Sequence, residues 1–544
     1  MKKLNPSTIR IGRRYRAKRL QEDYDAVIIG SGIGGLTSAA LLSDLGWKVC
    51  VLEQHYTAGG YTHSYDRNGY EWDVGVHYIG DVGAPTHTRQ LFDFISAGKL
   101  KWSPMDAEYD RFYIGDRVFS AIAGKQQFRQ NLLDRFPGEQ QAIDQYMQLL
   151  NRVGKAMPVY SLSRLLRPWQ RVLAWPLLKL KTPSLLFRNT YEVLSELTDN
   201  QDLIAVLCGQ WGDMGLPPRR SAFMVHAMIA RHYLHGGYYP VGGSWNIASS
   251  IIPQIQKSGG EVFTYARVRR ILLEGKQVAG VEMADGHRIS CTCVISSTGI
   301  SNTFSGLLPA ESVRQAGYEQ LLKRVKPSIA HLGVYIGLKE TAAQLGLPKT
   351  NFWIYPGNDF DRAVDRFIED PQASFPVVYI SFPSAKDPDY ERRRPGTATI
   401  EIVAPAPFEW FKKWQGTTWG KRGDDYEAFK TQLGERLMRH LFDKLPQLKD
   451  KIDYYEVSTP LSTDHFCAYQ QGELYGLDHD PVRLQQTWLG PRTRFKGLWL
   501  TGQDVLTCGV TGAMMAGLLT TSAIIGMRHS SVLLKRIFST VRPA

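Results

Sequence analysis

The chain has 544 residues, of which 43% are hydrophobic and 22% are charged, with 50 glycines and 13 tryptophans. This length predicts two or more structural units around a large buried core, and the composition argues against a disordered or fibrous chain. The formal net charge is +13, and the six cysteines are scattered without a CxxC pair, which argues against a disulfide framework and favours a reducing compartment.

The N-terminal twenty residues form a basic arm. Residues 1–20 contain eight Lys and Arg and no acidic residue. They lack the apolar stretch of a secretory or twin-arginine signal, so we expect the arm to be retained.

The next segment, residues 25–53, has the pattern of a dinucleotide-binding turn. A short apolar run precedes Gly30, Gly32 and Gly35 in GxGxxG spacing, and a helix of Ala and Leu and a second strand follow before Glu53. In this order the first glycine allows a tight exit from the strand, the second lets backbone amides approach a pyrophosphate, and the third lets the helix pack closely. The helix N-terminus would then face the phosphates, and Glu53 would accept hydrogen bonds from a ribose.

Three histidines follow this turn and raise the question of a metal site or of acid-base chemistry. His55, His63 and His77 are separated by 8 and 14 residues, with Glu53 and Asp73 nearby. Because this spacing matches neither HxxxH nor HxH, a metal site is not expected.

The segment 145–191 contains no Asp or Glu and mixes Arg164, Arg167 and Arg171 with Leu and Trp. Such a mixture is typical of an interfacial membrane-binding segment, where cations attract anionic lipid and Trp lies at headgroup depth. A basic solvated face over ordinary core leucines is the alternative, because four prolines are expected to cut any helix into short pieces. Nucleic-acid binding is not expected, since the basic residues alternate with Leu.

A second apolar run, 505–527, has no charged residue and is long enough to cross a bilayer. Its four glycines and four threonines dilute its hydrophobicity. We therefore expect a buried helix, with true membrane spanning as the alternative.

Blocks spread along the chain resemble a known family. The runs "LEQHYTAGG" and "GYEWDVGVHYIG" are similar to the retinol saturase group within the flavoprotein family that includes carotenoid isomerases and phytoene desaturases. The block 236–286, which begins "GGYYPVGGSWNIASS", resembles the central block of that family. The run "GLWLTGQDVLTCGVTGAMMAG", 497–517, resembles its C-terminal flavin motif, and the blocks keep the family's order.

The resemblance implies a fold of the amine oxidase and phytoene desaturase type. A Rossmann-type α/β FAD-binding domain would be assembled from discontinuous segments, and a mixed-sheet α+β substrate domain would carry the basic segment 145–191 at a membrane-facing substrate entrance. The expected boundaries are 1–20 for the basic arm, 21–95, 236–304 and 486–530 for the FAD domain, 96–235 and 305–485 for the substrate domain, and 531–544 for a basic C-terminal tail.

The same resemblance implies FAD as the cofactor and assigns its contacts by position. The first glycine turn would hold the pyrophosphate, Glu53 the ribose and Val268 the adenine through backbone groups. The C-terminal motif would meet the ribityl chain and the flavin pyrimidine, where the start of a helix favours negative charge. The expected FAD-binding residues are Gly30, Ser31, Gly32, Gly34, Gly35, Glu53, Gln54, Gly59, Gly60, Val268, Gly502, Gln503, Asp504, Gly509, Val510 and Thr511.

The chemistry implied by the resemblance is two-electron transfer between a flavin and a carbon-carbon double bond of a hydrophobic polyene or acyl lipid, with a side chain supplying the proton. The candidate proton donors are His77, Tyr78, His465 and Tyr469, each with structural packing as the alternative. A saturase is the first expectation, and a desaturase or a cis-trans isomerase could use the same scaffold.

Two further classes share the fold. An amine oxidase would need an aromatic cage beside the flavin, which the sequence does not place. A non-catalytic lipid carrier would have little reason to keep both ends of a flavin site. We expect an enzyme attached peripherally to the cytoplasmic side of a membrane, with an unidentified electron donor or acceptor, since no second dinucleotide motif supports direct use of NADPH.

Overall fold

Six parallel strands form the sheet that receives the first glycine turn. The computed structural model describes residues 7–21, 23–83 and 85–538. In spatial order the strands are β1 (Arg13–Arg14), β10 (Glu261–Thr264), β3 (Val49–Leu52), β2 (Ala26–Ile29), β14 (Val294–Ser296) and β20 (Leu498–Leu500), and all neighbours run parallel. The chain leaves β2 towards β3 on one side and returns to β14 on the other. The strand order therefore reverses between β2 and β14, which is where α/β sheets of this kind bind ligands.

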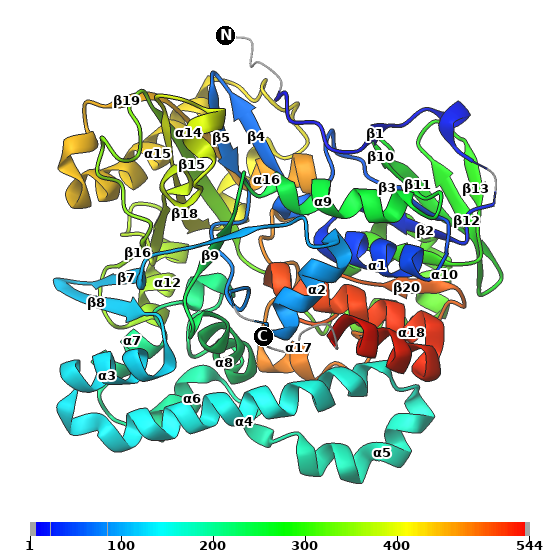
Figure 1. Cartoon of the computed structure of the whole chain (residues 1–544), viewed down its shortest axis with the longest axis horizontal. Helices are drawn as coiled ribbons and strands as arrows, with labels where there is room; N and C mark the ends of the chain where they lie inside the picture. Colours follow the sequence, from blue (N-terminus) through cyan, green and yellow to red (C-terminus); the bar gives the residue numbers. More distant parts are fainter. Residues whose placement is uncertain (1–6, 22, 84, 539–544) are drawn as a thin grey trace.

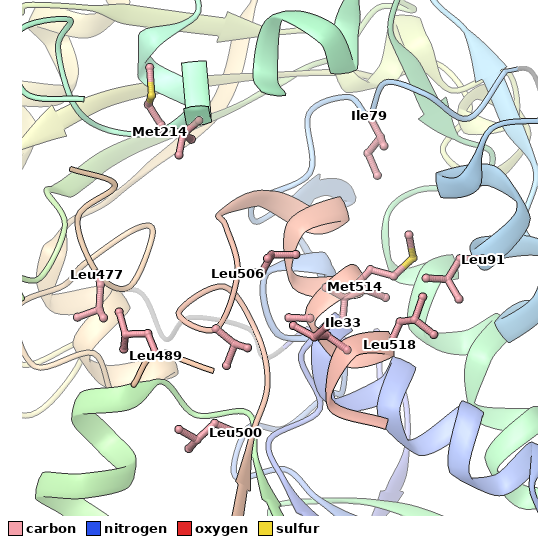
Figure 2. Close-up of a cluster of buried hydrophobic side chains, with 14 of the residues drawn as sticks. Ile33, Ile79, Leu91, Met214, Leu477, Leu489, Leu500, Leu506, Met514 and Leu518 are labelled. Atoms are coloured by element: carbon pink, nitrogen blue, oxygen red, sulfur yellow. The ribbon is translucent and has the colours of Figure 1, made fainter. Parts of the chain in front are cut away.

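The helices α1 (Ile33–Asp44) and α9 (Trp245–Gln256) pack on this sheet, and α2 (His87–Ser96) and α18 (Gly509–Phe538) pack against these helices. The helix α1 packs against both α9 and α18, and Figure 1 shows α1 in blue beside α18 in red. Figure 2 shows Ile33 of α1 next to Met514 and Leu518 of α18, in one continuous cluster of buried side chains. The Ala- and Leu-rich sequence of α1 is explained by this burial, since no face of its first three turns meets solvent.

A second, seven-stranded sheet has its own hydrophobic core. Its order is β19 (Ile452–Ser458), β15 (Ala330–Leu338), β18 (Ala398–Ala406), β17 (Val378–Ser381), β16 (Asn351–Tyr355), β7 (Glu108–Ile114) and β8 (Arg117–Ile122). Neighbours are antiparallel except for β16 and β7, so the sheet is mixed. The helix α15 (Asp424–Lys444) packs on it.

The remaining elements connect or extend these two sheets. The smaller strands are β4 (Ser64–Arg67), β5 (Tyr70–Asp73), β6 (Trp102–Pro104), β9 (Tyr238–Pro240), β11 (Val268–Glu274), β12 (Gln277–Met283) and β13 (Arg288–Ser290). The other α-helices are α3 (Lys125–Arg135), α4 (Gln140–Leu165), α5 (Pro168–Lys181), α6 (Thr190–Ser195), α7 (Gln201–Leu207), α8 (Phe223–Tyr233), α10 (Ala310–Gln315), α11 (Tyr318–Leu322), α12 (Phe360–Glu369), α13 (Pro383–Lys386), α14 (Tyr390–Arg393), α16 (Pro460–Cys467) and α17 (Pro481–Gln485).

The basic segment folds as two long helices, α4 and α5, which run along one edge of the molecule in Figure 1. The expectation that prolines cut it into short pieces is wrong. Pro158 and Pro176 lie inside α4 and α5, and Pro168 occupies the first turn of α5, where a proline is tolerated. The buried face of α4 offsets the one hydrogen bond that Pro158 removes.

The helix α18 corresponds to the uncharged run and to part of the expected basic tail. By length and composition it is the one helix in the described part of the chain that could cross a membrane, and 61% of its most apolar window is buried. It is kinked at Gly526 and continues to Phe538. Its first half is a core helix, as the sequence predicts, while residues 539–544 of the tail and 1–6 of the arm lie outside the described residues.

Candidate active site

A large cavity opens at the point where the strand order reverses. Gly30 follows β2, Ser297 follows β14 and Gly502 lies beyond β20, and all three line the cavity. Its volume is about 1850 Å³, whereas pockets for small molecules occupy roughly 300–1,000 Å³. The cavity can therefore hold a dinucleotide and a second long molecule at the same time.

The first glycine turn divides into residues that serve packing and residues that face the cavity. A Cβ on Gly35 would lie 2.4 Å from the carbonyl oxygen of Gly30, so Gly35 permits the close approach of helix and strand. A Cβ on Gly32 would meet only Ser297 Oγ, at 3.8 Å, which leaves open space in front of the turn. Gly32 is also the N-cap of α1 and offers no side-chain acceptor, so the first amides of the helix are available to an anion.

Glu53 ties the two ends of this turn together. Its carboxylate accepts hydrogen bonds from Ser31 N at 2.8 Å, Ser31 Oγ at 2.7 Å and His55 N at 2.8 Å. Ser31 Oγ in turn accepts from Gly59 N at 3.1 Å. Glu53 and the neighbouring Gln54 line the cavity, so the carboxylate is held at the wall by backbone groups.

The histidine cluster is an element of packing beside this wall. The rings of His55 and His63 lie 4.7 Å apart, and His63 Nδ1 lies 2.6 Å from the carbonyl oxygen of Gly60. Burial lowers the pKa of His63 to about 3 and that of His55 to about 4, so both rings are neutral at pH 7. No group of three His, Cys, Asp or Glu side chains in the described chain has the geometry of a metal site.

The opposite wall comes from the C-terminal motif. Gly502, Gln503, Gly509, Val510 and Thr511 line the cavity, and a Cβ on Gly509 would meet no atom within 4 Å. Thr511 Oγ1 is buried without a hydrogen-bond partner among the described residues. The start of α18 therefore presents both space and an unsatisfied hydroxyl to whatever fills the cavity.

Three of the residues expected at the cofactor stand behind the wall. Within the described chain, Ser31, Gly35 and Asp504 are not part of the cavity lining, whereas the other expected positions, including Gly34, Gly59, Gly60 and Val268, are. Asp504 is occupied elsewhere, because its carboxylate accepts from Ile300 N at 2.8 Å and from Leu477 N at 2.9 Å. It fixes the loops that carry the wall.

His77 and Tyr78 reach the middle of the cavity from the loop that follows β5. His77 Nδ1 lies 2.9 Å from the carboxyl of Glu401, and burial lowers the pKa of His77 to about 3. The Tyr78 hydroxyl donates to Asp110 at 2.9 Å and lies 3.4 Å from Asp213. Neither side chain carries a charge at pH 7, so His77 is not a cationic acid.

His465 and Tyr469 line the cavity further along. His465 stacks on Trp419 with ring centroids 5.7 Å apart. The Tyr469 hydroxyl accepts from Gln503 Nε2 at 3.3 Å, and its ring stacks on Tyr61 at 6.5 Å. Both side chains are thus held by neighbours, as scaffold residues would be, while facing the open space.

Sequence reasoning missed the polar groups around His77 and Tyr78, namely Asp110, Asp213, Lys386 and Glu401. Asp110 and Glu401 lie on β7 and β18 of the second sheet, whereas Lys386 ends α13 and Asp213 ends the 3-10 helix Trp211–Asp213. The one local signal was an isolated aspartate at position 213 in the otherwise uncharged stretch 203–216.

Part of the cavity lining consists of apolar residues from two helices, and some of these residues are also exposed at the surface. This part of the lining includes Met157, Leu162 and Leu165 of α4 and Leu534 and Phe538 of α18. The adjoining helix α5 exposes a row of large apolar side chains, namely Trp169, Val172, Leu173, Leu177 and Leu180, which are 56–81% exposed.

The structure corrects the expected role of two arginines in the basic segment. Arg164 is buried, and its guanidinium donates to the carbonyls of Leu484, Gln486 and Leu489. Arg171 is half-buried and donates to the carbonyl of Thr487 at 3.1 Å. These two cations anchor α4 and α5 to the loop before β20, so of the three arginines only Arg167 is exposed.

Three comparisons with known proteins agree with this geometry. A family described as an NAD(P)-binding Rossmann-like domain matches residues 28–95. The human protein named all-trans-retinol 13,14-reductase is 37% identical over 97% of this chain and 90% of its own length. A prolycopene isomerase of an Oncidium hybrid cultivar is 25% identical over 91% of this chain and 83% of its own length.

Among solved structures, putrescine oxidase bound to putrescine superposes with a TM-score of 0.60 at 15% identity, covering 92% of this chain and 99% of its own. At this identity the likeness shows the fold alone, which is that of the amine oxidase-like FAD-binding oxidoreductases, with mixed α/β sheets and a Rossmann-like domain. The fold class expected from the sequence is thereby confirmed.

Proposed function

Because this chain belongs to the all-trans-retinol 13,14-reductase family, we propose that it is an FAD-dependent oxidoreductase that saturates a carbon-carbon double bond of a hydrophobic polyene. One structural observation supports this proposal most directly. A single cavity of about 1850 Å³ is lined both by the dinucleotide turn and by apolar residues of α4 and α18, of which Leu162 and Leu534 are also exposed at the surface. A flavin and a polyene can therefore lie in contact inside it.

The residues at the polar end fit FAD. The open space in front of Gly32 and Gly509 and the unpaired hydroxyl of Thr511 are features that a bound group would fill. The pyrophosphate would lie at the first turn, with Glu53 and Gln54 at the adenosine ribose. The adenine would lie at Val268 and the ring system at the start of α18, where the helix dipole favours negative charge.

When bound, FAD would supply the two-electron transfer to the double bond. The residues of the chain would bind the polyene and control the protons. The aromatic side chains of Trp211, Tyr233, Trp353 and Tyr379 line the cavity beyond the flavin end and can hold a flat conjugated chain. A polyene and a flavin that fill the cavity would exclude bulk water, which leaves protons under the control of the side chains in the wall.

The apolar row on α5 supports peripheral attachment to a membrane. A helix that exposes Trp and Leu beside a cavity mouth suits an enzyme that draws an insoluble substrate from a bilayer. The cytoplasmic side is the expected location, and the electrons are expected from a separate donor, since the sequence has no second dinucleotide motif.

An isomerase is the second candidate, because prolycopene isomerases are relatives along most of the chain. The two activities differ in the balance of hydrogen. A saturase adds two hydrogens to each product molecule, whereas an isomerase leaves the mass of the substrate unchanged.

The test is an anaerobic reaction with product analysis. The protein, reconstituted with FAD and reduced with dithionite, is mixed with a panel that contains all-trans-retinol and a cis-carotenoid. We expect products heavier by two hydrogens and reoxidation of the flavin. An altered isomer pattern at constant mass supports the isomerase, and a protein that binds polyene but no flavin supports the lipid carrier.

A further inference from the structure

Two carboxyl groups lie at the cavity wall, Asp213 half-buried and Asp110 fully buried, and neither is among the residues proposed for the cofactor. Asp213 lines the cavity at the end of the 3-10 helix Trp211–Asp213, and Asp110 lies behind it on β7. The Tyr78 hydroxyl bridges them, at 2.9 Å from Asp110 and 3.4 Å from Asp213. We propose that Asp213 is the proton donor of the reduction, with Asp110 and Tyr78 as its positioning residues; this inference rests on the proposed function.

The hydrogen bonds divide the roles of the two carboxyls. Asp110 accepts from three donors, which are the Tyr78 hydroxyl, Gln210 Nε2 at 2.8 Å and Asn351 Nδ2 at 2.9 Å. Among the described residues, the Asp213 carboxyl has one partner, the Tyr78 hydroxyl. That hydroxyl has a single hydrogen, and the nearer Asp110 takes it. A second hydrogen in the bridge must therefore come from Asp213.

A buried cation reinforces this division. Lys386 Nζ donates to Asn351 Oδ1, and the same Asn351 donates to Asp110. Burial raises the pKa of Asp110, whereas its hydrogen bonds from Asn351, Tyr78 and Gln210 lower it, and the lysine at the end of this chain also favours the ionised carboxyl. Burial lowers the pKa of Lys386 to about 7, while Asp110 is among the groups that raise it.

The surroundings of Asp213 favour its protonated form. Burial and the nearby Asp110 raise the pKa of Asp213 well above its usual value, and only the hydrogen bond from Tyr78 opposes them. The other titratable groups that face Asp213 are all neutral at pH 7, because burial raises the pKa of each one. They are Tyr233, Tyr355, Tyr379, Tyr475 and Cys508. Two carboxyls in unlike surroundings are a usual source of one acid and one base.

Asp213 is also tied to the wall where the flavin ring is proposed. Its carbonyl oxygen accepts from Cys508 Sγ at 3.4 Å, and Cys508 directly precedes the first residue of α18. The neighbouring carbonyl of Gly212 accepts from the Tyr475 hydroxyl at 2.9 Å. The backbone that carries the carboxyl is thus fixed to the residue before α18 and to Tyr475.

The reaction balances with this donor. When bound, reduced FAD would supply a hydride with its electron pair to one carbon of the double bond as the π bond breaks. The O–H bond of Asp213 breaks, and its proton forms the new C–H bond on the neighbouring carbon. The alkene would thus be reduced and the FAD oxidised. The Tyr78 hydroxyl can turn its one hydrogen from Asp110 to the remaining Asp213 carboxylate until solvent returns a proton, because Gln210 and Asn351 still donate to Asp110.

The test compares Asp213→Asn with the wild-type holoenzyme. We expect turnover of the polyene to fall by about 10²-fold or more, the usual contribution of a general acid, with flavin content unchanged. The infrared spectrum of the protein without substrate should lose one band of a protonated carboxyl at pH 7. Asp361→Asn removes a buried carboxyl outside the cavity, where Asp361 accepts from Arg219 N, and should leave turnover unchanged.

The variant Asp110→Asn provides a second test, which distinguishes proton donation by Asp213 from a purely structural role of that residue. Activity requires protonated Asp213, so it is present at low pH and lost as pH rises through the pKa of that carboxyl. Removing the charge of Asp110 lowers this pKa, and the alkaline limb of the kcat profile should move to lower pH.

Wild-type turnover by Asp213→Asn, an unchanged carboxyl band, or an alkaline limb that stays in place in Asp110→Asn would each overturn the assignment of the donor. A wild-type holoenzyme that reduces no polyene would instead refute the proposed function. The infrared comparison is independent of the substrate and remains informative in that case.

Discussion

The contact between α1 and α18 yields the sharpest prediction, because at Gly34 two backbones touch. A Cβ on Gly34 would lie 2.8 Å from Gly502 N, 2.9 Å from Gly502 Cα and 3.0 Å from the carbonyl oxygen of Ala513. These neighbours are backbone atoms that cannot rotate away. Gly34 lies inside α1, and alanine readily adopts the helical backbone conformation of this position. The loss of stability in Gly34→Ala therefore comes from the steric clash alone.

The expected cost follows from two opposing effects. Overpacking of a tight contact costs about 1–3 kcal/mol, and replacing glycine by alanine in a helix returns about 1 kcal/mol. Because these backbone atoms cannot move aside, the overpacking cost lies in the upper part of that range, about 2–3 kcal/mol, and the net loss of unfolding free energy is about 1–2 kcal/mol. For a chain of 544 residues this loss lowers Tm by about 1–2 °C. Because Gly502 must move and lies in the cavity wall, retention of flavin should fall as well.

The assay is thermal unfolding together with the ratio of flavin to protein after gel filtration. The matched control is Gly138→Ala, since a Cβ on Gly138 would meet no atom within 4 Å. If Gly34→Ala behaves like this control in both measurements, the close packing of α1 on the C-terminal motif is wrong.

Three more predictions concern the anchor, the membrane face and the cofactor wall. Arg164→Ala should lower the unfolding free energy, measured by denaturant titration, by about 3 kcal/mol because it leaves buried carbonyls unpaired. Arg167→Ala, which changes an exposed side chain, should leave this free energy unchanged. Equal losses in the two variants would contradict the anchoring role of Arg164. Leu173→Glu should weaken co-sedimentation with anionic liposomes by about tenfold or more. The same change at Ile368, an exposed apolar residue away from α5, should not weaken it. Unchanged sedimentation of the Leu173 variant would refute membrane contact by α5. Glu53→Gln should raise the Kd for FAD by about tenfold or more through loss of charge-assisted hydrogen bonds, measured by fluorescence titration, and wild-type affinity would refute the role of Glu53.

The local parts of the site could be predicted from the sequence because each one lies within a single short segment. The strand, the glycine turn and the acid at Glu53 follow one another within about thirty residues, and their spacing reflects backbone geometry alone. The same holds for the glycines that open α18. A position within a motif does not fix the direction of its side chain, however, as Asp504 demonstrates by turning to the amides of Ile300 and Leu477.

Features that depend on long-range packing could not be predicted from the sequence. Composition marks the segment 145–191 as basic and apolar, but it does not reveal that Arg164 points inward to three carbonyls of a loop more than 300 residues away. The pairing of Asp110 with Asp213 depends on how the second sheet stacks against the 3-10 helix at Trp211. Such a pair leaves no periodic or spacing signal, so only the fold could reveal it.

The most direct test of the central claim, that one cavity holds reduced flavin in contact with a polyene, is a single-turnover titration. The reduced holoenzyme is mixed anaerobically with substoichiometric all-trans-retinol, and loss of polyene absorbance is followed together with return of the oxidised flavin bands. The account predicts that one double bond is lost for each flavin reoxidised, with a product heavier by two hydrogens. Flavin that stays reduced while the polyene remains intact, or reoxidation without any change in the mass of the polyene, would contradict it.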